Sequence, residues 1–320
     1  MRVAVAGEAL IDFASIGDLR FQGYCGGSPL NTAVAVARLG TATGYISQLS
    51  TDPFGQRLRQ HMEANDVDTR FVLSHPAPST LAFVQQEHGE NRYVFLANRT
   101  ADTLYDPDPA PTLPAEAAFL AFGSVSLLAE PSAGSFTRLV EAHRRRLSVV
   151  FDPNVRATLI ADAADYRRRL ERWVSMSHLV KLSEEDVAYL AGDGAPDEAI
   201  ARWLETGPAA VLLTLGSEGA RVYRRGRDPL GVPGFRVDVA DTIGAGDTFT
   251  AGAIVGLLES GVVDPAGLAA LTDDVWRSVL RFAIAAAAIT CTRRGADPPT
   301  HAEVDALLAG RDGTVPDAGA

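Results

Sequence analysis

The chain has 320 residues, of which 47% are hydrophobic and 22% are charged, and its formal net charge is −11. This is the composition of an ordinary globular protein, and the negative charge disfavours nucleic acid or an anionic membrane as the main partner. Cys25 and Cys291 form no spacing motif, which favours free thiols in a reducing compartment. The chain shows no signal-peptide pattern and no apolar run near the ~18 residues that a membrane helix needs. We therefore expect a cytoplasmic protein that binds neither nucleic acid nor membrane.

The first part of the chain predicts a buried strand followed by polar residues. Residues 2–7 form a short, valine-containing apolar run that is typical of a buried parallel strand. Asp12 follows where this strand should end, and ligands of open α/β sheets bind outside the carboxyl ends of the strands. Asp12 is therefore either a substrate-binding residue or an acid in a solvated turn. A hairpin with its turn at Gly17-Asp18 comes next.

A glycine-rich helix entrance follows the hairpin, in the sequence Gly26-Gly-Ser-Pro-Leu-Asn31. We expect Ser28 to cap a helix that begins at Pro29 and ends before Gly40. Asn31 lies in the first turn of this otherwise apolar helix. Its amide could bind a hydroxyl group of a ligand, or it could have only a local capping role.

Residues 67–96 contain β-rich pieces with no helix between them, at residues 71–73, 80–84 and 92–96. We expect these pieces to be antiparallel strands that form a small sheet with the preceding hairpin, separate from the main sheet. The strands of this lid would come from about residues 12–24 and 67–100. Such a sheet suits a lid over a binding site, and it also suits the contact surface of a homodimer.

From residue 118 onward, strands and helices alternate, with strands predicted at residues 119–123, 148–152, 178–182 and 210–215. This order predicts a doubly wound, mostly parallel sheet with helices on both faces, which makes three layers. Residues 221–223 and 235–239 indicate edge strands. No linker is long enough to divide the chain, so we expect one domain over residues 1–310 and a disordered tail at residues 311–320.

The stretch Val239-Ala-Asp-Thr-Ile-Gly-Ala-Gly-Asp-Thr-Phe-Thr-Ala-Gly252 predicts a glycine turn that leads into an apolar helix. Glycines let the backbone turn tightly, and the first N–H groups of a helix attract anions. Asp247 in the first helical turn could take a proton from a hydroxyl group while neighbouring amides stabilise a phosphoryl group. Alternatively, Asp247 only complements the helix dipole.

Three further strand ends carry polar residues that would meet at the same edge of the sheet. Arg156, after one strand, could pair with an anionic oxygen or form a surface ion pair. The acids of Lys181-Leu-Ser-Glu-Glu-Asp186 could order the waters of Mg²⁺ or simply begin a helix. The glycines of Thr214-Leu-Gly-Ser-Glu-Gly219 would let a nucleobase or ribose approach the backbone. Together with the Asp247 motif, these strand ends favour a catalytic site.

Two of these stretches match the two signatures of one enzyme family. The stretch from Gly26-Gly-Ser-Pro-Leu-Asn31 to Gly55 and the stretch from Asp241-Thr-Ile-Gly-Ala-Gly-Asp247 to Gly252 resemble those of ribokinase-like (PfkB) carbohydrate kinases. Within that family the chain is most similar to fructokinases, which it resembles at residues 122–131, 152–156, 181–183 and 290–296. The resemblance covers residues 3–308 or so. It implies a ribokinase-like three-layer fold with a small antiparallel β lid.

The resemblance also implies the activity. The enzyme would transfer the γ-phosphoryl group of ATP to a primary hydroxyl group of a small sugar, with D-fructose to fructose 6-phosphate as the leading case. Asp247 would be the catalytic base, and the transferred group would be held by the amides of Gly244, Ala245 and Gly246. The sugar would be bound by Asp12, Gly26, Gly27, Asn31 and Arg156. The nucleotide would be bound by Asn154, Lys181, Thr214, Gly216 and Gly219.

Mg²⁺, and in some relatives K⁺, are implied in the same way. The family's metal motif is usually Asn-x-x-Glu, and Ser183-Glu-Glu-Asp186 stands in its place. Asp186, or Glu185 in its stead, would then order the Mg²⁺ waters, and a K⁺ site would be bordered by Asp241 and the backbone of Ile243. Many relatives carry an aromatic residue and Arg in the lid where this chain has Leu96-Ala97. This difference disfavours an acid sugar as substrate.

Other functions compete with this interpretation. Within the same chemistry, the substrate could be 2-keto-3-deoxygluconate, ribose or a nucleoside. A non-catalytic protein that senses sugar or nucleotide is a second class, although it would not need Asp247 and the intact Gly-Ala-Gly sequence. A dinucleotide-dependent oxidoreductase would need Gly-x-Gly-x-x-Gly directly after the first strand, and Gly7-Glu-Ala-Leu-Ile-Asp12 is not that motif.

Overall fold

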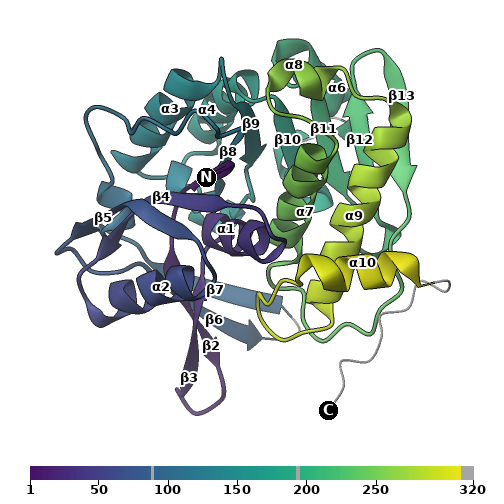
Figure 1. The fold of residues 1–320 in the computed structure, drawn as a ribbon. Helices are drawn as coiled ribbons and strands as arrows, with labels where there is room; N and C mark the ends of the chain where they lie inside the picture. Colours follow the sequence, from purple (N-terminus) through teal and green to yellow (C-terminus); the bar gives the residue numbers. More distant parts are fainter. Residues whose placement is uncertain (88–89, 192–194, 311–320) are drawn as a thin grey trace.

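The computed structural model describes residues 1–87, 90–191 and 195–310, and the tail predicted at residues 311–320 lies outside them. The described residues form a nine-stranded sheet with the strand order β13-β12-β11-β10-β9-β8-β1-β4-β5, and a four-stranded sheet with the order β3-β2-β6-β7 (Figure 1). The strands of the large sheet are β1 (Val3–Ala6), β4 (Thr43–Ser50), β5 (Asp68–His75), β8 (Phe119–Gly123), β9 (Ser148–Asp152), β10 (Leu179–Ser183), β11 (Ala210–Thr214), β12 (Ala220–Arg224) and β13 (Arg227–Val232). The small sheet contains β2 (Leu10–Ser15), β3 (Phe21–Gly26), β6 (Leu81–Glu87) and β7 (Glu90–Leu96).

Helices connect most of the strands of the large sheet. They are α1 (Ser28–Arg38), α2 (Pro53–Ala64), α3 (Ser132–His143), α4 (Ala163–Met176), α5 (Glu184–Ala191), α6 (Pro196–Thr206), α7 (Ala245–Glu259), α8 (Pro265–Ala269), α9 (Asp273–Cys291) and α10 (His301–Ala309). In the large sheet, neighbouring strands are parallel in the order β11-β10-β9-β8-β1-β4-β5. The strands β12 and β13 add an antiparallel edge beside β11. This confirms the predicted α/β fold with a mostly parallel sheet.

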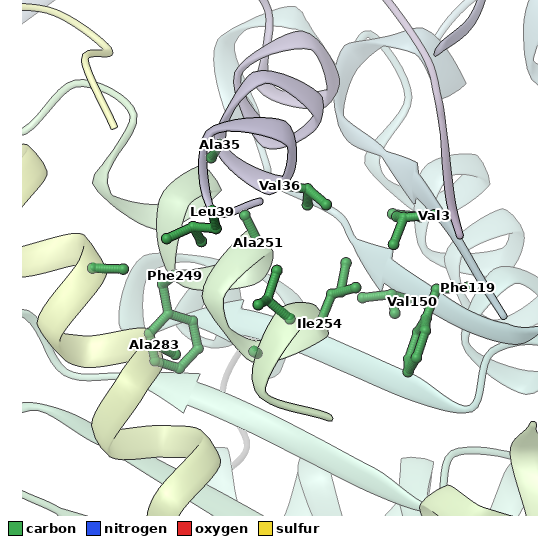
Figure 2. Close-up of a cluster of buried hydrophobic side chains, with 14 of the residues drawn as sticks. Val3, Ala35, Val36, Leu39, Phe119, Val150, Phe249, Ala251, Ile254 and Ala283 are labelled. Carbon is green, nitrogen blue, oxygen red and sulfur yellow. The ribbon is translucent and has the colours of Figure 1, made fainter. Parts of the chain in front are cut away.

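The sheet separates two hydrophobic cores, because successive side chains of a strand point to opposite faces. In β1, Val3 and Val5 belong to one core and Ala4 and Ala6 to the other. The first core also contains α1, α7 and α9, and the second contains α3, α4 and α6. Figure 2 shows part of the first core, where side chains of α1, α7 and the sheet meet. Helices therefore cover both faces, which is the three-layer arrangement predicted from the sequence.

Helix α7 lies deep in the first core, and its position is fixed by close backbone packing. It is buried along most of its length, in agreement with its nearly continuous apolar sequence. A Cβ atom at Gly252 would lie 2.8 Å from Cα of Ala283 on α9, and one at Gly256 would lie 3.4 Å from Cα of Val279. Glycine at these positions lets α7 and α9 pack at van der Waals distance.

The small sheet differs from the predicted lid in two ways. Its strand β2 pairs in parallel with β6, so the sheet is mixed rather than antiparallel. Moreover, β5, which was predicted as a lid strand, pairs in parallel with β4 at the edge of the large sheet. The physical reason is that α2 connects β4 to β5, and a strand–helix–strand unit places its two strands in parallel in one sheet.

The second predicted edge strand, at residues 235–239, is also wrong. The chain turns at Gly226, where φ is +66°, and β13 pairs antiparallel with β12 immediately afterwards. Glycine adopts this left-handed conformation without strain. Residues 233–240 have no strand and lead to the turn before α7. Within the described residues, no helix is both long and apolar enough to span a membrane.

Candidate active site

The glycine turn before α7 forms the centre of the site. Gly244 has φ of +76° in the left-handed region and precedes the first residue of the helix. A Cβ atom there would lie 2.7 Å from Cβ of Ala296, so only glycine fits this turn without displacing the chain. The helix begins with Ala245, Gly246 and Asp247. The first N–H groups of a helix have no intrahelical acceptor and can bind an anion, although the N–H of Ala245 donates here to the carbonyl of Thr242 at 3.3 Å.

The carboxylate of Asp247 is held by two side chains of α1. The hydroxyl of Ser28 donates to Oδ1 at 2.6 Å, and the amide of Asn31 donates to Oδ2 at 2.9 Å. Asp247 is 9% exposed. Ser28 does not cap α1 as predicted, because Gly27 occupies the N-cap position and no side chain caps the helix. The hydroxyl of Ser28 instead orients the carboxylate at the start of α7.

Asp12 faces this carboxylate from the lid hairpin. Burial raises the pKa of Asp12 to about 6, while Arg156 opposes the shift and Asp247 adds to it. A Cβ atom at Gly26 would lie 2.0 Å from Oδ2 of Asp12, so Gly26 makes room for this side chain. Gly27 has φ of +106°, and a Cβ atom there would lie 2.8 Å from the carbonyl oxygen of Glu8. The predicted sugar-binding residues thus gather around Asp247.

A buried ion pair lies beneath the helix start. Nζ of Lys181 is 3.2 Å from Oδ2 of Asp152, which also accepts a hydrogen bond from the hydroxyl of Thr250. Burial raises the pKa of Asp152 to about 6, although Lys181 opposes this shift. Burial disfavours the charge of Lys181, but nearby carboxylates, Asp152 foremost, outweigh it and raise its pKa. A Cβ atom at Gly246 would lie 3.1 Å from Nζ of Lys181. The lysine therefore places positive charge next to the candidate anion site.

The residues predicted to bind the nucleotide follow neighbouring strands. Ser183 and Thr214 are paired at the ends of β10 and β11, and the hydroxyl of Thr214 donates to the carbonyl of Leu182 at 3.2 Å. Gly216 and Gly219 have φ of +53° and +104°. A Cβ atom at Gly219 would lie 2.1 Å from the carbonyl oxygen of Val232, so this loop admits no side chain there. Gly219 is buried, whereas Gly216 is exposed and a Cβ atom there would meet nothing within 4 Å, so the open backbone at Gly216 leaves room for a flat group.

Asn154 and Arg156 follow β9 in the same region. Asn154 adopts φ of +38°, and its N–H donates to Oδ1 of Asp152 at 3.1 Å. The guanidinium of Arg156 donates to the backbone carbonyl of Val155 at 3.2 Å. The structure thus anchors this loop to the buried acid of the ion pair.

Asp186 does not point toward the site as a free carboxylate. Its Oδ1 accepts from the N–H of Val155 at 2.7 Å, and its Oδ2 accepts from both the N–H and the hydroxyl of Ser183 at 2.7 and 2.8 Å. The side chain is 3% exposed, whereas Glu185 is exposed. The described residues contain no cluster of three His, Cys, Asp or Glu side chains that could hold a metal ion. The predicted role of Asp186, or of Glu185 in its stead, in ordering the waters of a hydrated Mg²⁺ stays a prediction.

Asp241 connects the glycine turn to the loop after α9. Its Oδ1 accepts from the N–H groups of Thr242 and Ile243 at 2.7 and 3.1 Å, and its Oδ2 accepts from the N–H of Gly295 at 2.9 Å. Ile243 is 46% exposed. With three N–H donors, the Asp241 carboxylate is already satisfied. Its bonds to the two loops are the observed role, and the predicted K⁺ site stays a prediction.

Sequence reasoning missed Ser28, Thr250 and Glu8 as parts of the site. Burial raises the pKa of Glu8 to about 8, and its carboxylate accepts from the N–H of Ser126 at 3.1 Å. Glu8 therefore fastens the turn after β1 to the segment after β8. Thr250 follows Asp247 by three residues, which is close to one helical turn, so the 3.6-residue helix period was the signal that could have placed it on the same side of α7.

The three-layer fold, with polar side chains at the carboxyl ends of its parallel strands, is that of an α/β protein that binds ligands at this edge of the sheet. The sequence profile of the pfkB family carbohydrate kinase matches residues 2–303, and the chain belongs to this family. The predicted enzyme class, an ATP-dependent carbohydrate kinase, is therefore confirmed.

Two curated relatives are similar over most of their length. A fructokinase of Rhizobium leguminosarum bv. trifolii is 33% identical over 280 residues, covering 86% of each chain. A fructokinase of Klebsiella pneumoniae is 34% identical over 299 residues, covering 92% of this chain and 94% of its own. These similarities agree with the sequence-based expectation of a fructokinase-like protein.

Solved structures show the same fold. A fructokinase of Xylella fastidiosa with bound ATP has a TM-score of 0.88 and 30% identity, over 96% of this chain and 97% of its own. A fructokinase double mutant of Vibrio cholerae O395, bound to fructose, ADP and potassium ion, has a TM-score of 0.85 and 26% identity, over 96% and 98% of the two chains. An aminoimidazole riboside kinase of Salmonella enterica, complexed with aminoimidazole riboside and an ATP analog, has a TM-score of 0.81 and 26% identity, over 96% and 99%. The fold is therefore shared by kinases of different substrates.

Proposed function

We propose that this carbohydrate kinase transfers the γ-phosphoryl group of ATP to a primary hydroxyl group of D-fructose and forms fructose 6-phosphate. The observation that carries the proposal is the position of Asp247. Its carboxylate is oriented by Ser28 and Asn31 at the start of α7, and its charge acts on Asp12, which also feels the charge of Arg156. A base for a hydroxyl proton and an anion site for a phosphoryl group are thus adjacent.

In this mechanism, the sugar lies between Asp12 and Asp247. Asp12, ionised at neutral pH, accepts hydrogen bonds from sugar hydroxyls, and Asn31 and the backbone at Gly26 and Gly27 complete this contact surface. Asp247 accepts the proton of the attacking hydroxyl as its oxygen bonds to the phosphorus atom. ADP leaves with the electrons of the broken phosphorus–oxygen bond.

The negative charge of the transferred group would be stabilised by fixed positive groups. The N–H groups of Gly244, Ala245 and Gly246 are directed by the helix start, and Lys181 lies next to Gly246. Arg156 lies near Asp12 and adds a mobile cation on the sugar side. Positioning and charge neutralisation account for most of the rate enhancement in phosphoryl transfer. A bound Mg²⁺ would supply further charge neutralisation.

The nucleotide would lie along the ends of β9, β10 and β11. Thr214, Gly216 and Gly219 would flank the base and ribose, and Asn154 with Lys181 would lie toward the phosphates. Support comes from the left-handed glycines, which leave backbone exposed there, and from the similar fructokinase of Xylella fastidiosa with bound ATP.

Fructose is proposed over other sugars because both curated relatives described above are fructokinases. A nucleoside is the second candidate, since the aminoimidazole riboside kinase has the same fold at 26% identity. Leu96, which is exposed at 53%, occupies a lid position that suits neither a carboxylate nor another charged group. An acid sugar such as 2-keto-3-deoxygluconate is therefore less favoured. K⁺ activation, a homodimer formed through the lid and a cytoplasmic location stay predictions.

The test is ATP consumption by the purified protein with Mg²⁺ and either K⁺ or Na⁺. The substrate panel contains fructose, 2-keto-3-deoxygluconate, ribose, glucose, tagatose and adenosine. A clear preference in kcat/KM for fructose supports the proposal. Preference for another member keeps the kinase and replaces the sugar. Tight ATP binding with no turnover on any member would favour the sensor function.

A further inference from the structure

A cavity lies against the lid hairpin, and Asp12 is not among its lining residues, although Tyr24, the cross-strand partner of Asp12 on β3, is. Its volume is about 430 Å³, within the range of small-molecule sites. It is lined by β2 and β3, by α1 and α2, and by residues 294–297 after α9. Ile11 and Phe13 line it, while Asp12 between them does not. Because neighbouring residues of a strand point to opposite faces, this cavity is separate from the proposed sugar site.

The cavity concentrates positive charge in a chain whose net charge is −11. Arg38, Arg57 and Arg294 line it together with a single acid, Asp297. Arg38 is paired with that acid at 2.6 Å. The exposed side chains of Arg57 and Arg294 make no ion pair or side-chain hydrogen bond within the part of the chain that the structure describes. Two guanidinium groups are thus free to bind an anion.

The positive charges of the cavity also affect the pKa of His61. It lines the cavity on α2 and is half-buried. Burial lowers its pKa, and the charges of Arg57 and Arg38 lower it further. The neutral imidazole would still offer an N–H donor to an anionic oxygen.

The rest of the lining is apolar and aromatic. Phe13 and Phe54 meet edge to face with ring centroids 5.8 Å apart, and Val34 of α1 and Ile11 of β2 lie on the same cavity. A small inorganic anion would leave this apolar surface exposed to water. An anionic ligand with a flat or apolar body would cover it and gain from its burial.

We propose that this cavity binds a small organic phosphate monoester, with the phosphate between Arg57 and Arg294 and the body of the ligand against Phe13 and Phe54. Arginine suits this role because its planar fork binds phosphate oxygens in pairs. The proposed site goes beyond the proposed function, since neither the sugar nor the transferred group is placed there.

The loop that carries Arg294 also touches the glycine turn of the candidate active site. The N–H of Gly295 donates to Asp241 at 2.9 Å, and Ala296 is the residue against which Gly244 packs. A ligand that orders Arg294 therefore orders the loop that supports the start of α7. We expect bound ligand to slow hydrogen exchange at residues 241–246 as well as at residues 294–297.

The test uses the full chain and isothermal titration calorimetry with phenyl phosphate, an aromatic phosphate monoester that is neither sugar nor nucleotide. Inorganic phosphate is titrated in parallel. We expect one binding site for phenyl phosphate and weaker binding of inorganic phosphate. The double substitution Arg57→Ala/Arg294→Ala should weaken phenyl phosphate binding by about tenfold or more, since each loses a charge-assisted contact.

Matched controls separate this site from general charge effects and from the active site. Arg145→Ala/Arg277→Ala removes two other exposed arginines that do not line the cavity and should leave the affinity unchanged. Asp247→Asn should also leave it unchanged. If the double variant does not fold, as judged by circular dichroism, the single variants Arg57→Ala and Arg294→Ala replace it.

Three results would overturn the proposal. These are no binding of phenyl phosphate to the folded wild-type protein at millimolar concentration, equal weakening in both double variants, and binding that neither double variant weakens. Calorimetry measures no turnover, so these outcomes do not depend on whether the chain phosphorylates fructose.

Discussion

The starts of α7 and α5 look alike in the sequence, yet the structure gives their acids different surroundings. Asp247 and Asp186 each lie in the first turn of a helix that follows a glycine turn or a strand end, and both are buried. The donors to Asp247 are side chains of another helix. The donors to Asp186 include two backbone N–H groups and the hydroxyl of Ser183, three residues earlier.

This difference supports the proposal that Asp247 is the reactive carboxylate, and it gives Asp186 a structural role in the hydrogen bonds of its own loop. Backbone donors make Asp186, in the first turn of α5, the residue that holds Ser183 before the helix and the loop at Val155, so removing it leaves these N–H groups unpaired. Asp247 instead depends on side chains that position it without a role in the backbone of α7. The two buried acids thus differ in their donors, which are side chains of α1 for Asp247 and mainly backbone N–H groups for Asp186.

The largest expected effect is on Asp247. Asp247→Asn should lower kcat by about 10²–10⁴-fold, because the amide cannot accept the sugar proton. ATP affinity and the unfolding midpoint should change little. Steady-state kinetics and calorimetric titration with ATP measure both quantities. Unchanged turnover with a large loss of ATP affinity would contradict the role of Asp247 as the base.

The same kind of substitution at Asp186 should act on stability. Asp186→Ala should lower the free energy of unfolding by about 1–3 kcal/mol, since it leaves two backbone donors unpaired at a helix start. Urea denaturation followed by circular dichroism measures this change. If stability were unchanged while the Mg²⁺ concentration needed for half-maximal activity rose tenfold, Asp186 would belong to the metal site and the contrast with Asp247 would be lost.

The serines that donate to the two acids provide a matched pair. Ser28→Ala should lower kcat by about tenfold, because Asp247 loses the 2.6 Å hydrogen bond that orients it. Ser183→Ala should instead lower the free energy of unfolding by about 1 kcal/mol and leave kcat within twofold. The two variants are compared by kinetics and by urea denaturation. If Ser28→Ala lowered only stability and Ser183→Ala lowered only kcat, the roles proposed for Asp247 and Asp186 would be reversed.

The smallest expected effect is on the pH dependence of sugar binding. Asp12 has a folded-state pKa of about 6, raised mainly by burial, so its carboxylate ionises as pH rises through about 6. Sugar KM should fall several-fold between pH 5 and pH 7 as the charged acceptor forms. Since the folded state holds this proton more tightly than the unfolded chain, Asp12 favours folding at low pH, and this contribution is lost as pH rises toward 6.

The control for this pH effect is Asp12→Asn, because Asp152 has a pKa in the same range. The variant should bind the sugar more weakly and show a flat KM profile between pH 5 and pH 7. A profile that keeps its slope in the variant would assign the titration to Asp152 or to another group.

The sequence predicted the three-layer fold because alternation of apolar strands and helices carries that information locally. It misplaced β5 because residues 71–73 alone give no sign of their partner, and only the helix before them decides that β4 is adjacent. The wrong prediction at residues 235–239 has a similar cause. The tight turn at Gly226 places β13 against the edge of β12, so residues 235–239 do not pair there.

For the site, the sequence could predict which strand ends carry polar residues but not which side chains are hydrogen-bonded to one another. Ser28 and Asp247 are 219 positions apart, and no local pattern distinguishes a capping serine from one that orients a distant acid. The same limit applies to Asp186, since the backbone donors that hold its carboxylate leave no trace in residue types.

The glycine contacts between α7 and α9 have a consequence for motion. With Gly252 against the backbone of Ala283 and Gly256 against that of Val279, α7 has little free volume in which to shift or rotate. If substrate entry requires movement, we expect it in the four-stranded sheet, which lies apart from α7 and α9 in Figure 1. The carboxylate of Asp247, the proposed base, would then keep its position on α7 while the lid moves.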